Sequence, residues 1–304
     1  MKTIDALENL VSGFLQDQTA SPPDILWHYT NAAGFLGIFR SGRLWATNTD
    51  YLNDASEMRY AKHLVVRGVN SVRSSAENRE EHEMLNLLCE CIGSNVTRPV
   101  FVTSLSAEKN ELSQWRAYGG SSGSFALGFN SDRLVAAIAK NTDTRFNLYK
   151  CIYDEAHSAS LCQQFVESLL QEFRSHRHAH TAGGSDYQET LNLVHEAVRI
   201  FDTLAPLIKH PDFVRESEWR LVSDPVDLTK RPIRLREGRT RIVPYLELTI
   251  AKDKSDPKFT VHTLIGPAIS YSPRDINLAQ IAYCDDFILQ PFPVEPSTTP
   301  YRHG

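Results

Sequence analysis

The chain has 304 residues, of which 41% are hydrophobic and 23% are charged, and its formal net charge at pH 7 is -5. This composition is ordinary for a globular protein and allows one large domain or two small ones. The acidic balance gives no general support for nucleic-acid binding, although it is compatible with a local basic groove. No apolar run approaches the about 20 residues of a membrane span, and no secretory signal is evident. We therefore expect a cytoplasmic protein that does not engage a membrane.

Metal and thiol chemistry are not indicated. The five cysteines are scattered, and Cys89 and Cys91 are separated by a single residue, which is not zinc-ligand spacing. His176, His178 and His180 alternate, so on a helix they would point to different faces and share no metal. We expect reduced thiols, a solvated helix end and no metal site.

Hydrophobic periodicity predicts the elements in chain order. A packing helix over residues 2–17 and a linker to residue 24 precede the strand that begins at Ile25. Further strands are predicted over residues 43–47, 99–106, 124–129, 145–153, 218–223, 233–235, 240–250 and 260–265, and helices over 31–42, 55–70, 77–93, 111–118, 156–177, 186–208 and 273–281. Strands at both ends of a helical middle indicate an α+β domain rather than a doubly wound parallel sheet.

The first strand ends in three polar residues, His28, Tyr29 and Thr30, and runs directly into a helix. Thr30 or Asn31 is expected to cap that helix at its start, and Gly42 at its end. A strand end beside a helix N-terminus forms a pocket wall that suits an anion such as a pyrophosphate. The alternative is a buried strand end whose polar groups are satisfied internally.

A later stretch carries paired carboxylates. If residues 216–222 form a strand, Glu216, Glu218 and Arg220 share one face, and Trp219 lies on the other. A cross-strand ion pair explains this pattern structurally, and the residues alone favour that explanation. The functional alternative is a site for a cationic centre or a sugar hydroxyl.

Taken together, three segments resemble the ADP-ribosyltransferase superfamily, whose members bind NAD on a split sheet. They are a histidine at a first strand end, Thr103-Ser104-Leu105-Ser106 on a second strand, and Glu216-x-Glu218 on a third. More closely, the chain resembles a bacterial family known as domain of unknown function 2971. The matching text is Trp27-His28-Tyr29-Thr30, Leu44-Trp45-Ala46, Leu52-Asn53-Asp54 with Glu57, Ser104-Leu105-Ser106, Trp115-Arg116-Ala117-Tyr118, Gly123, Gly128-Phe129, Glu216-x-Glu218-Trp219-Arg220, Ile265-Gly266-Pro267 and Pro300-Tyr301-Arg302.

The resemblance implies a split mixed or antiparallel sheet with peripheral helices. It places a single domain over residues 25–304, with a helical hairpin inserted at about 156–208 and a helix and linker at 1–24. It also implies an NAD-dependent transferase, either a toxin or an antiviral-defence effector, that modifies a protein or a nucleic acid. An inhibitor or antitoxin protein would be a further partner.

The resemblance also implies roles for single residues. Glu218 would hold the nicotinamide ribose and stabilise its oxocarbenium ion, as carboxylates do in glycoside cleavage, and Glu216 would orient the acceptor. His28 would bind a ribose hydroxyl, and Ser104 would steady Glu218. The remaining residues expected to contact NAD are Tyr29, Thr30, Asn53, Trp115 or Tyr118 as the aromatic that stacks on nicotinamide, and Arg302 near the pyrophosphate.

Two departures leave the acceptor class open. The second strand has Thr-Ser-Leu-Ser in place of Ser-Thr-Ser, and His28 occurs together with a serine and Glu-x-Glu, which mixes two branches of the superfamily. The main alternative function is a non-catalytic module that senses a nucleotide or docks a partner. A weaker alternative is a metal-dependent hydrolase or nuclease built on the acidic clusters around Asp54 and Glu218.

Overall fold

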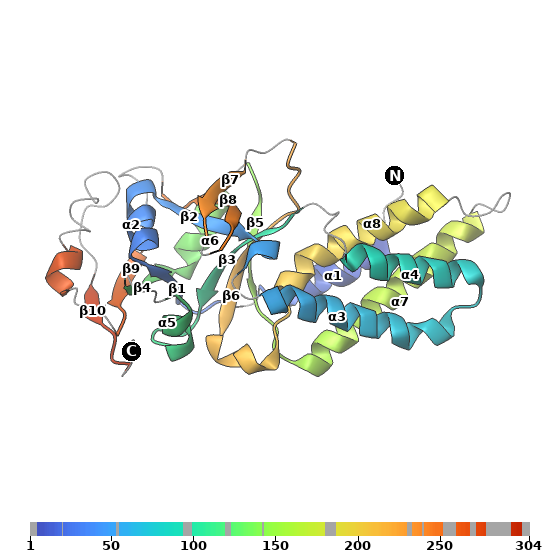
Figure 1. Cartoon of the computed structure of the whole chain (residues 1–304), viewed down its shortest axis with the longest axis horizontal. Helices are drawn as coiled ribbons and strands as arrows, with labels where there is room; N and C mark the ends of the chain where they lie inside the picture. Colours follow the sequence, from blue (N-terminus) through green and yellow to red (C-terminus); the bar gives the residue numbers. More distant parts are fainter. Residues whose placement is uncertain are drawn as a thin grey trace.

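The computed structural model describes residues 5–19, 21–52, 55–93, 99–118, 123–141, 143–179, 187–229, 233–238, 240–251, 260–267, 272–277 and 293–299. A ten-stranded sheet forms one half of an elongated molecule, and a bundle of helices forms the other (Figure 1). The strands are β1 (Ile25–Asn31), β2 (Arg43–Asn48), β3 (Phe101–Ser106), β4 (Ser124–Asn130), β5 (Phe146–Lys150), β6 (Glu218–Ser223), β7 (Arg234–Glu237), β8 (Ile242–Thr249), β9 (Thr260–Ile265) and β10 (Val294–Pro296). The helices are α1 (Asp5–Asp17), α2 (Ala32–Ser41), α3 (Ala55–Val72), α4 (Arg79–Gly93), α5 (Leu112–Tyr118), α6 (Ser131–Ala139), α7 (Glu155–Ala179) and α8 (Tyr187–Leu204), and the 3-10 turns are η1 (Thr49–Tyr51), η2 (Arg73–Ser75), η3 (Ala205–Leu207) and η4 (Pro211–Glu216).

The helical half has a core of its own. Buried aliphatic and aromatic residues of α1, α3, α4, α7 and α8 pack together, with Phe165 and Phe201 near the centre. Helices α3 and α7 approach closely at Gly68, where a Cβ atom would lie 3.0 Å from the carbonyl oxygen of Cys162. Helices α7 and α8, which correspond to the predicted hairpin of residues 156–208, pack in this bundle together with α1, α3 and α4.

The sheet is split at β3. Strand β6 pairs with β3 along residues 102–106, whereas β1 pairs with β3 at Ser106 and β2 pairs with it at Phe101 and Val102. Because an edge of a strand accommodates one partner at a given position, β1 and β2 lie on the same edge of β3 and diverge from it. All strand pairs are antiparallel except β9 with β10, so the predicted mixed α+β sheet is confirmed.

The two faces of the sheet are covered differently. The face that carries Leu26, Leu105 and Leu221 packs against the apolar stripes of α2 and α6. The other face carries Trp27 and Tyr29, which pack against α5. Further along this second face, Val102 and Val222 belong to the core of the helical half, which joins the two halves of the molecule.

Most predicted elements are confirmed, and the differences are local. Strand β6 runs from Glu218 to Ser223, as predicted. Because η4 ends at Glu216 and Ser217 adopts a left-handed conformation with φ 41°, Glu216 does not share a strand face with Glu218, as it would if the strand began at residue 216. Helix α6 and the short strand β10 were not anticipated from the sequence. No described helix has the length and apolar character needed to cross a membrane.

Candidate functional site

The end of β1 leads into α2 as the sequence predicts. Of the two candidate caps, Asn31 performs the capping: its side-chain oxygen accepts a hydrogen bond from the amide of Gly34 at 2.9 Å. Gly42 ends the helix in the left-handed region, with φ 61°. The Thr30 hydroxyl lies beside Gly34, where it would contact any added Cβ atom. Thr30 is thereby held at the first turn of α2, and its side chain is partly exposed.

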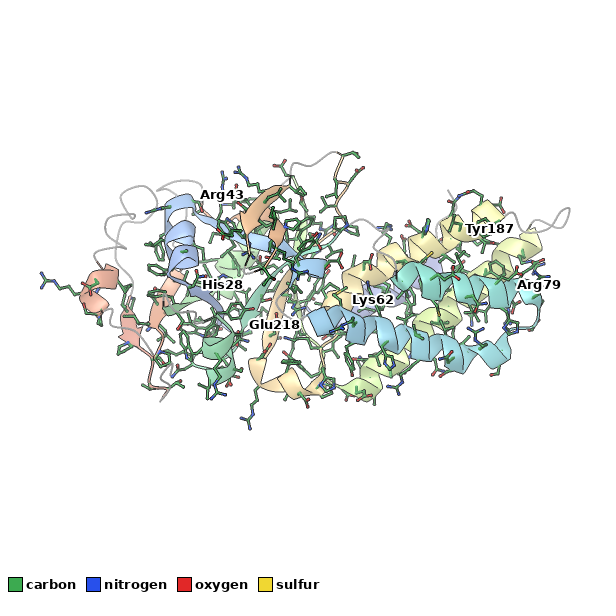
Figure 2. The ribbon with its side chains drawn as sticks, viewed as in Figure 1. His28, Arg43, Lys62, Arg79, Tyr187 and Glu218 are labelled. Atoms are coloured by element: carbon green, nitrogen blue, oxygen red, sulfur yellow. The ribbon has the colours of Figure 1, made fainter. Side chains whose placement is uncertain are left out.

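His28 lies at the split of the sheet (Figure 2). Its Nδ1 atom is 3.0 Å from the carbonyl oxygen of Ser104, at a position of β3 between the pairings with β1 and β2. A carbonyl oxygen only accepts, so Nδ1 carries the proton and donates. Burial lowers the pKa of the imidazole and outweighs this hydrogen bond, which raises it. A neutral ring with Nδ1 protonated leaves Nε2 as a hydrogen-bond acceptor, which suits a hydroxyl group.

Tyr29 and Trp115 have structural contacts that occupy them. The Tyr29 hydroxyl donates to the carbonyl of Glu108 at 2.8 Å and accepts from the amide of Glu111 at 3.0 Å. Trp115 is only 1% exposed, and its ring meets that of Tyr29 edge-on at 4.8 Å. Its Nε1 atom donates to Asn110 at 2.8 Å. Both residues therefore hold α5 against β1, and neither presents a free face for stacking.

Glu218 lies in a buried ion cluster, which we define as Lys209, Glu216, Glu218 and Arg220. The guanidinium of Arg220 donates to both oxygens of Glu218, Nε to Oε1 at 2.7 Å and Nη2 to Oε2 at 3.0 Å. The ammonium of Lys209 donates to the same Oε2 atom and to Glu216 at 2.5 Å. Burial of the Glu218 carboxyl opposes ionisation, but the two cations more than offset it and lower its pKa to about 2. The Glu218 carboxylate is therefore ionised and is held between two basic side chains.

Backbone contacts fix the position of this carboxylate. The Tyr153 hydroxyl accepts from the amide of Glu218 at 2.8 Å, and Arg220 also donates to the carbonyl of Pro206 at 2.6 Å. The Ser106 hydroxyl donates to the carbonyl of Glu216 at 2.7 Å. The start of β6 is therefore held from three sides.

Of the two aromatic residues of α5, Tyr118 is the one whose ring a ligand can reach. Its side chain is partly exposed, unlike that of Trp115. Burial raises the pKa of its hydroxyl, and the negative charge of Glu218 raises it further, which places Tyr118 close to the cluster. Between the two aromatic candidates, the exposure of the side chains favours Tyr118.

The strand register determines which predicted residues share a face. Trp27 pairs with Ser106, and Ser106 pairs with Glu218, so these three side chains project to the same side of the sheet. Ser104 pairs with Arg220 on that side as well. His28 follows Trp27 by one residue, so it projects to the opposite side.

The three motif segments are therefore adjacent, but His28 and Glu218 do not face each other across one surface. A ligand that contacts both must pass through the split between β1 and β2 or around the end of the strands. Asn53 and Arg302, the two remaining predicted NAD contacts, lie outside the described residues, as do Asp54 and Tyr301.

Lys209 is the main residue of the ion cluster that the sequence did not identify as part of the site. It is 2% exposed and follows an apolar run that ends at Ile208. A lone lysine between apolar residues is a weak signal, and only the fold brings it to the carboxylates. Ser106 and Tyr153 were also missed as contacts of this segment, because their partners are backbone groups.

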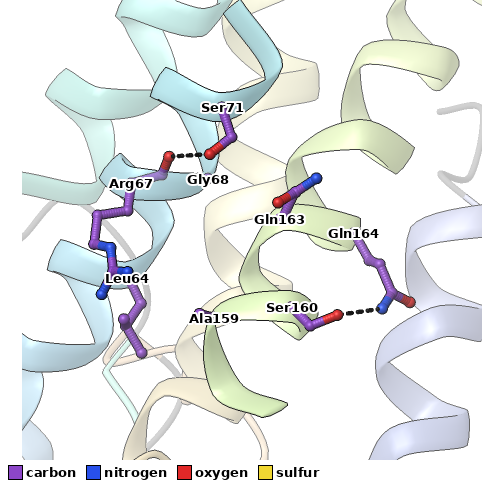
Figure 3. Close-up of a pocket in the computed structure, with 8 residues that line it drawn as sticks. All are labelled: Leu64, Arg67, Gly68, Ser71, Ala159, Ser160, Gln163 and Gln164. Carbon is purple, nitrogen blue, oxygen red and sulfur yellow. Dashed lines mark hydrogen bonds between the residues drawn. The ribbon is translucent and has the colours of Figure 1, made fainter. Parts of the chain in front are cut away.

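Away from the cluster, an open pocket lies between α3 and α7 (Figure 3). It is lined largely by polar side chains, among them Arg67, Ser71, Gln163 and Gln164. None of the predicted site residues lines it. No group of three or more histidine, cysteine, aspartate or glutamate side chains suited to a metal occurs in the described part of the chain.

The chain matches a family model over part of its length. No curated protein and no solved structure matches the chain. The matched family segment begins within α5 and ends within β6, so it contains Tyr118 and all four residues of the ion cluster. Residues 114–221 match the family described as Protein of unknown function (DUF2971), which supports the resemblance to that family but not the one to the ADP-ribosyltransferase superfamily.

Proposed function

We propose that the protein is an NAD-dependent ADP-ribosyltransferase. The observation that carries this proposal is the alignment of Trp27, Ser106 and Glu218 across β1, β3 and β6. The three segments on which the superfamily resemblance rests lie on neighbouring strands. The residue aligned with Ser106 and Glu218 is Trp27, one residue before His28. Nothing in their order along the chain requires this arrangement.

The proposed reaction is cleavage of the bond between nicotinamide and ribose. Nicotinamide leaves with the electron pair of the C–N bond, positive charge develops on the ribose, and an acceptor nucleophile forms the new bond and loses its proton. A carboxylate placed beforehand stabilises that charge. Glu218 is this carboxylate and Tyr118 stacks on nicotinamide, both on the same side of the sheet, whereas His28 projects to the other side and takes no part in this step.

The reaction requires a rearrangement within the ion cluster. Both oxygens of Glu218 are occupied by Arg220 and Lys209, so one must be released to reach a ribose hydroxyl. Lys209 already donates to Glu216 at 2.5 Å. Transfer of Lys209 wholly to Glu216, together with release of Nη2 of Arg220 from Oε2 of Glu218, frees that oxygen while each cation keeps a carboxylate partner.

The test is nicotinamide release from NAD by the wild type and by Glu218→Gln. We expect the variant to lose at least about 100-fold in rate, the size of effect seen when one charge-stabilising group is removed. Glu81→Gln is the matched control, since Glu81 is a buried carboxylate paired with Arg174 at 2.8 Å in the helical half. Glu216→Gln is expected to impair transfer to an acceptor more than nicotinamide release.

Far-UV circular dichroism establishes that each variant is folded. A folded Glu218→Gln variant that releases nicotinamide at the wild-type rate would refute the proposed role of Glu218. A wild type that binds NAD but consumes none would refute transferase activity itself.

One observation favours a second function, a non-catalytic module that binds a nucleotide or a partner. The carboxylate of Glu218 is fully paired and 3% exposed, which suits a structural anchor. This function predicts saturable NAD binding by calorimetry without turnover. Covalent labelling of any acceptor by isotopically labelled NAD would exclude it.

A further inference from the structure

Residues 230–241 are strongly basic in an acidic chain. This stretch contains six basic residues and one acidic residue, whereas the whole chain has a net charge of -5. The basic residues are Lys230, Arg231, Arg234, Arg236, Arg239 and Arg241. The described part of this stretch forms β7 and leads into β8, at one edge of the sheet (Figure 1).

Strand pairing places Arg234 and Arg236 on one face of the sheet, together with Arg43 of β2. Arg234 pairs with Tyr245, and Tyr245 pairs with Thr47, so the three project to the same side. Arg236 lies two residues after Arg234, and Trp45 lies two residues before Thr47, so both project to that side as well. Arg43 precedes Trp45 by two residues and joins them; Figure 2 marks its position at the outer part of the sheet.

We call the set Arg43, Trp45, Arg234, Arg236 and Arg241 the arginine face. Its positive charge is only partly neutralised. Glu247 pairs with two of the arginines, with Arg43 and with Arg234 at 3.1 Å. Within the described ranges, no carboxylate pairs with Arg236 or Arg241.

The two unneutralised arginines have weak partners. Arg236 donates to the Thr47 hydroxyl at 3.2 Å, while its buried Nε atom has no hydrogen-bond acceptor among the described residues. Arg241 donates to the carbonyls of Asp50 and Leu52, both at 3.2 Å, and to no other acceptor in the part of the chain that the structure describes. Each guanidinium therefore retains donor capacity and a full positive charge, which anionic oxygens would satisfy.

Aromatic rings are interleaved with these charges. Trp45 is 40% exposed, whereas the other three tryptophans, Trp27, Trp115 and Trp219, are at most 4% exposed. Arg236 lies 5.9 Å from the centre of the Trp45 ring, and Arg241 lies 4.8 Å from that of Tyr51. A large exposed aromatic side chain among arginines is the combination that binds bases and phosphates of an unpaired strand.

We propose that the arginine face binds single-stranded nucleic acid. The arginines contact successive phosphates, and Trp45 stacks on a base. A duplex keeps its bases stacked on one another, so it offers Trp45 no free base face, and we expect it to bind more weakly. The assignment of the bound strand as the acceptor of ADP-ribose rests on the proposed function, whereas the binding of the strand does not depend on it.

The experiment uses the full chain without NAD. Tryptophan fluorescence is titrated with oligothymidylate and oligouridylate of about 20 nucleotides and with a duplex of equal length. Because Trp45 is the one exposed tryptophan of the four, stacking should quench its emission. Trp45→Phe should abolish the quenching and weaken binding severalfold, as measured by anisotropy of a labelled oligonucleotide.

Charge dependence gives an independent readout. Arg234→Ala, Arg236→Ala and Arg241→Ala should each weaken binding by severalfold and flatten the plot of log affinity against log salt by about 0.7. Arg79→Ala is the matched control, since Arg79 is 90% exposed on α4 in the helical half (Figure 2). Arg241→Lys retains the charge and should recover most of the binding that Arg241→Ala loses.

Three results would overturn the proposal: no saturable binding, equal binding of duplex and single strand, or an equal loss in Arg79→Ala. The proposed function is tested separately by nicotinamide release. A chain that consumes NAD without binding oligonucleotides refutes only the arginine face. A chain that binds oligonucleotides without consuming NAD refutes only the transferase.

Discussion

Replacing Lys209 by methionine tests whether the buried ion cluster is a balanced unit. The variant keeps an unbranched side chain of similar length but removes one of two positive charges. Lys209 is 2% exposed and bonds both Glu216 and Glu218, so the variant takes away a cation that both carboxylates contact. Removing one partner of a buried ion pair typically costs about 3–5 kcal/mol.

The pKa of Glu218 gives a second estimate of the same quantity. Its folded-state pKa of about 2, against an ordinary 4.5, corresponds to about 3 kcal/mol of stability from Arg220 and Lys209 together, net of burial. Lys209 supplies part of this amount and also pairs with Glu216. We therefore expect Lys209→Met to lower the free energy of unfolding at neutral pH by about 3 kcal/mol.

The sign of the pH dependence follows from the lowered pKa. Glu218 contributes its full stability above pH 4.5 and loses it as pH falls toward about 2. Without Lys209 the carboxyl is protonated at a higher pH than in the wild type. The difference in stability between wild type and Lys209→Met should therefore shrink as the solution becomes acidic.

The assay is urea denaturation followed by tryptophan fluorescence, because all four tryptophans lie in the sheet half. The double variant Lys209→Met with Glu216→Gln restores charge balance and should recover about 1–2 kcal/mol. Lys109→Met, which removes an exposed pair with Glu295, should leave the denaturation midpoint nearly unchanged. The reasoning is refuted if Lys209→Met costs less than about 1 kcal/mol or if the double variant is no more stable than the single one.

Two further predictions concern the fold. Gly42→Ala should destabilise the protein by about 1–2 kcal/mol in the same denaturation assay, since φ is 61° and the added Cβ would lie 2.5 Å from the carbonyl oxygen of Ala251. Gly37→Ala in the same helix has no atom within 4 Å of its added Cβ and should be neutral or stabilising; the opposite order would contradict the geometry. Burial raises the pKa of the Cys162 thiol to about 12, so iodoacetamide should alkylate Cys162 only after denaturation, as read by mass spectrometry. Cys89, which is partly exposed, should react before Cys162, and early labelling of Cys162 would show that α7 opens readily.

The sequence by itself determined the local elements and one end of the candidate site. Periodicity and caps predicted the strand that ends at Thr30, the helix between Asn31 and Gly42, and the pair of long helices after residue 155, because these signals depend on neighbouring residues only. The same signals missed α6, for which Asn130 provides the cap. They predicted β6 from Glu218, but they left open whether Glu216 shared its face, since the left-handed turn at Ser217 contains no glycine that would mark it in the sequence.

Tertiary structure alone decided how these pieces meet. The register of β1, β3 and β6 aligned Trp27 with Glu218 and directed His28 to the other face, and register depends on contacts between residues far apart in sequence. Packing of the helical half brought Lys209 onto two carboxylates, an interaction with no sequence signature. Strand pairing likewise turned a scattered set of arginines into one face beside Trp45, because only the fold determines which charges share a surface.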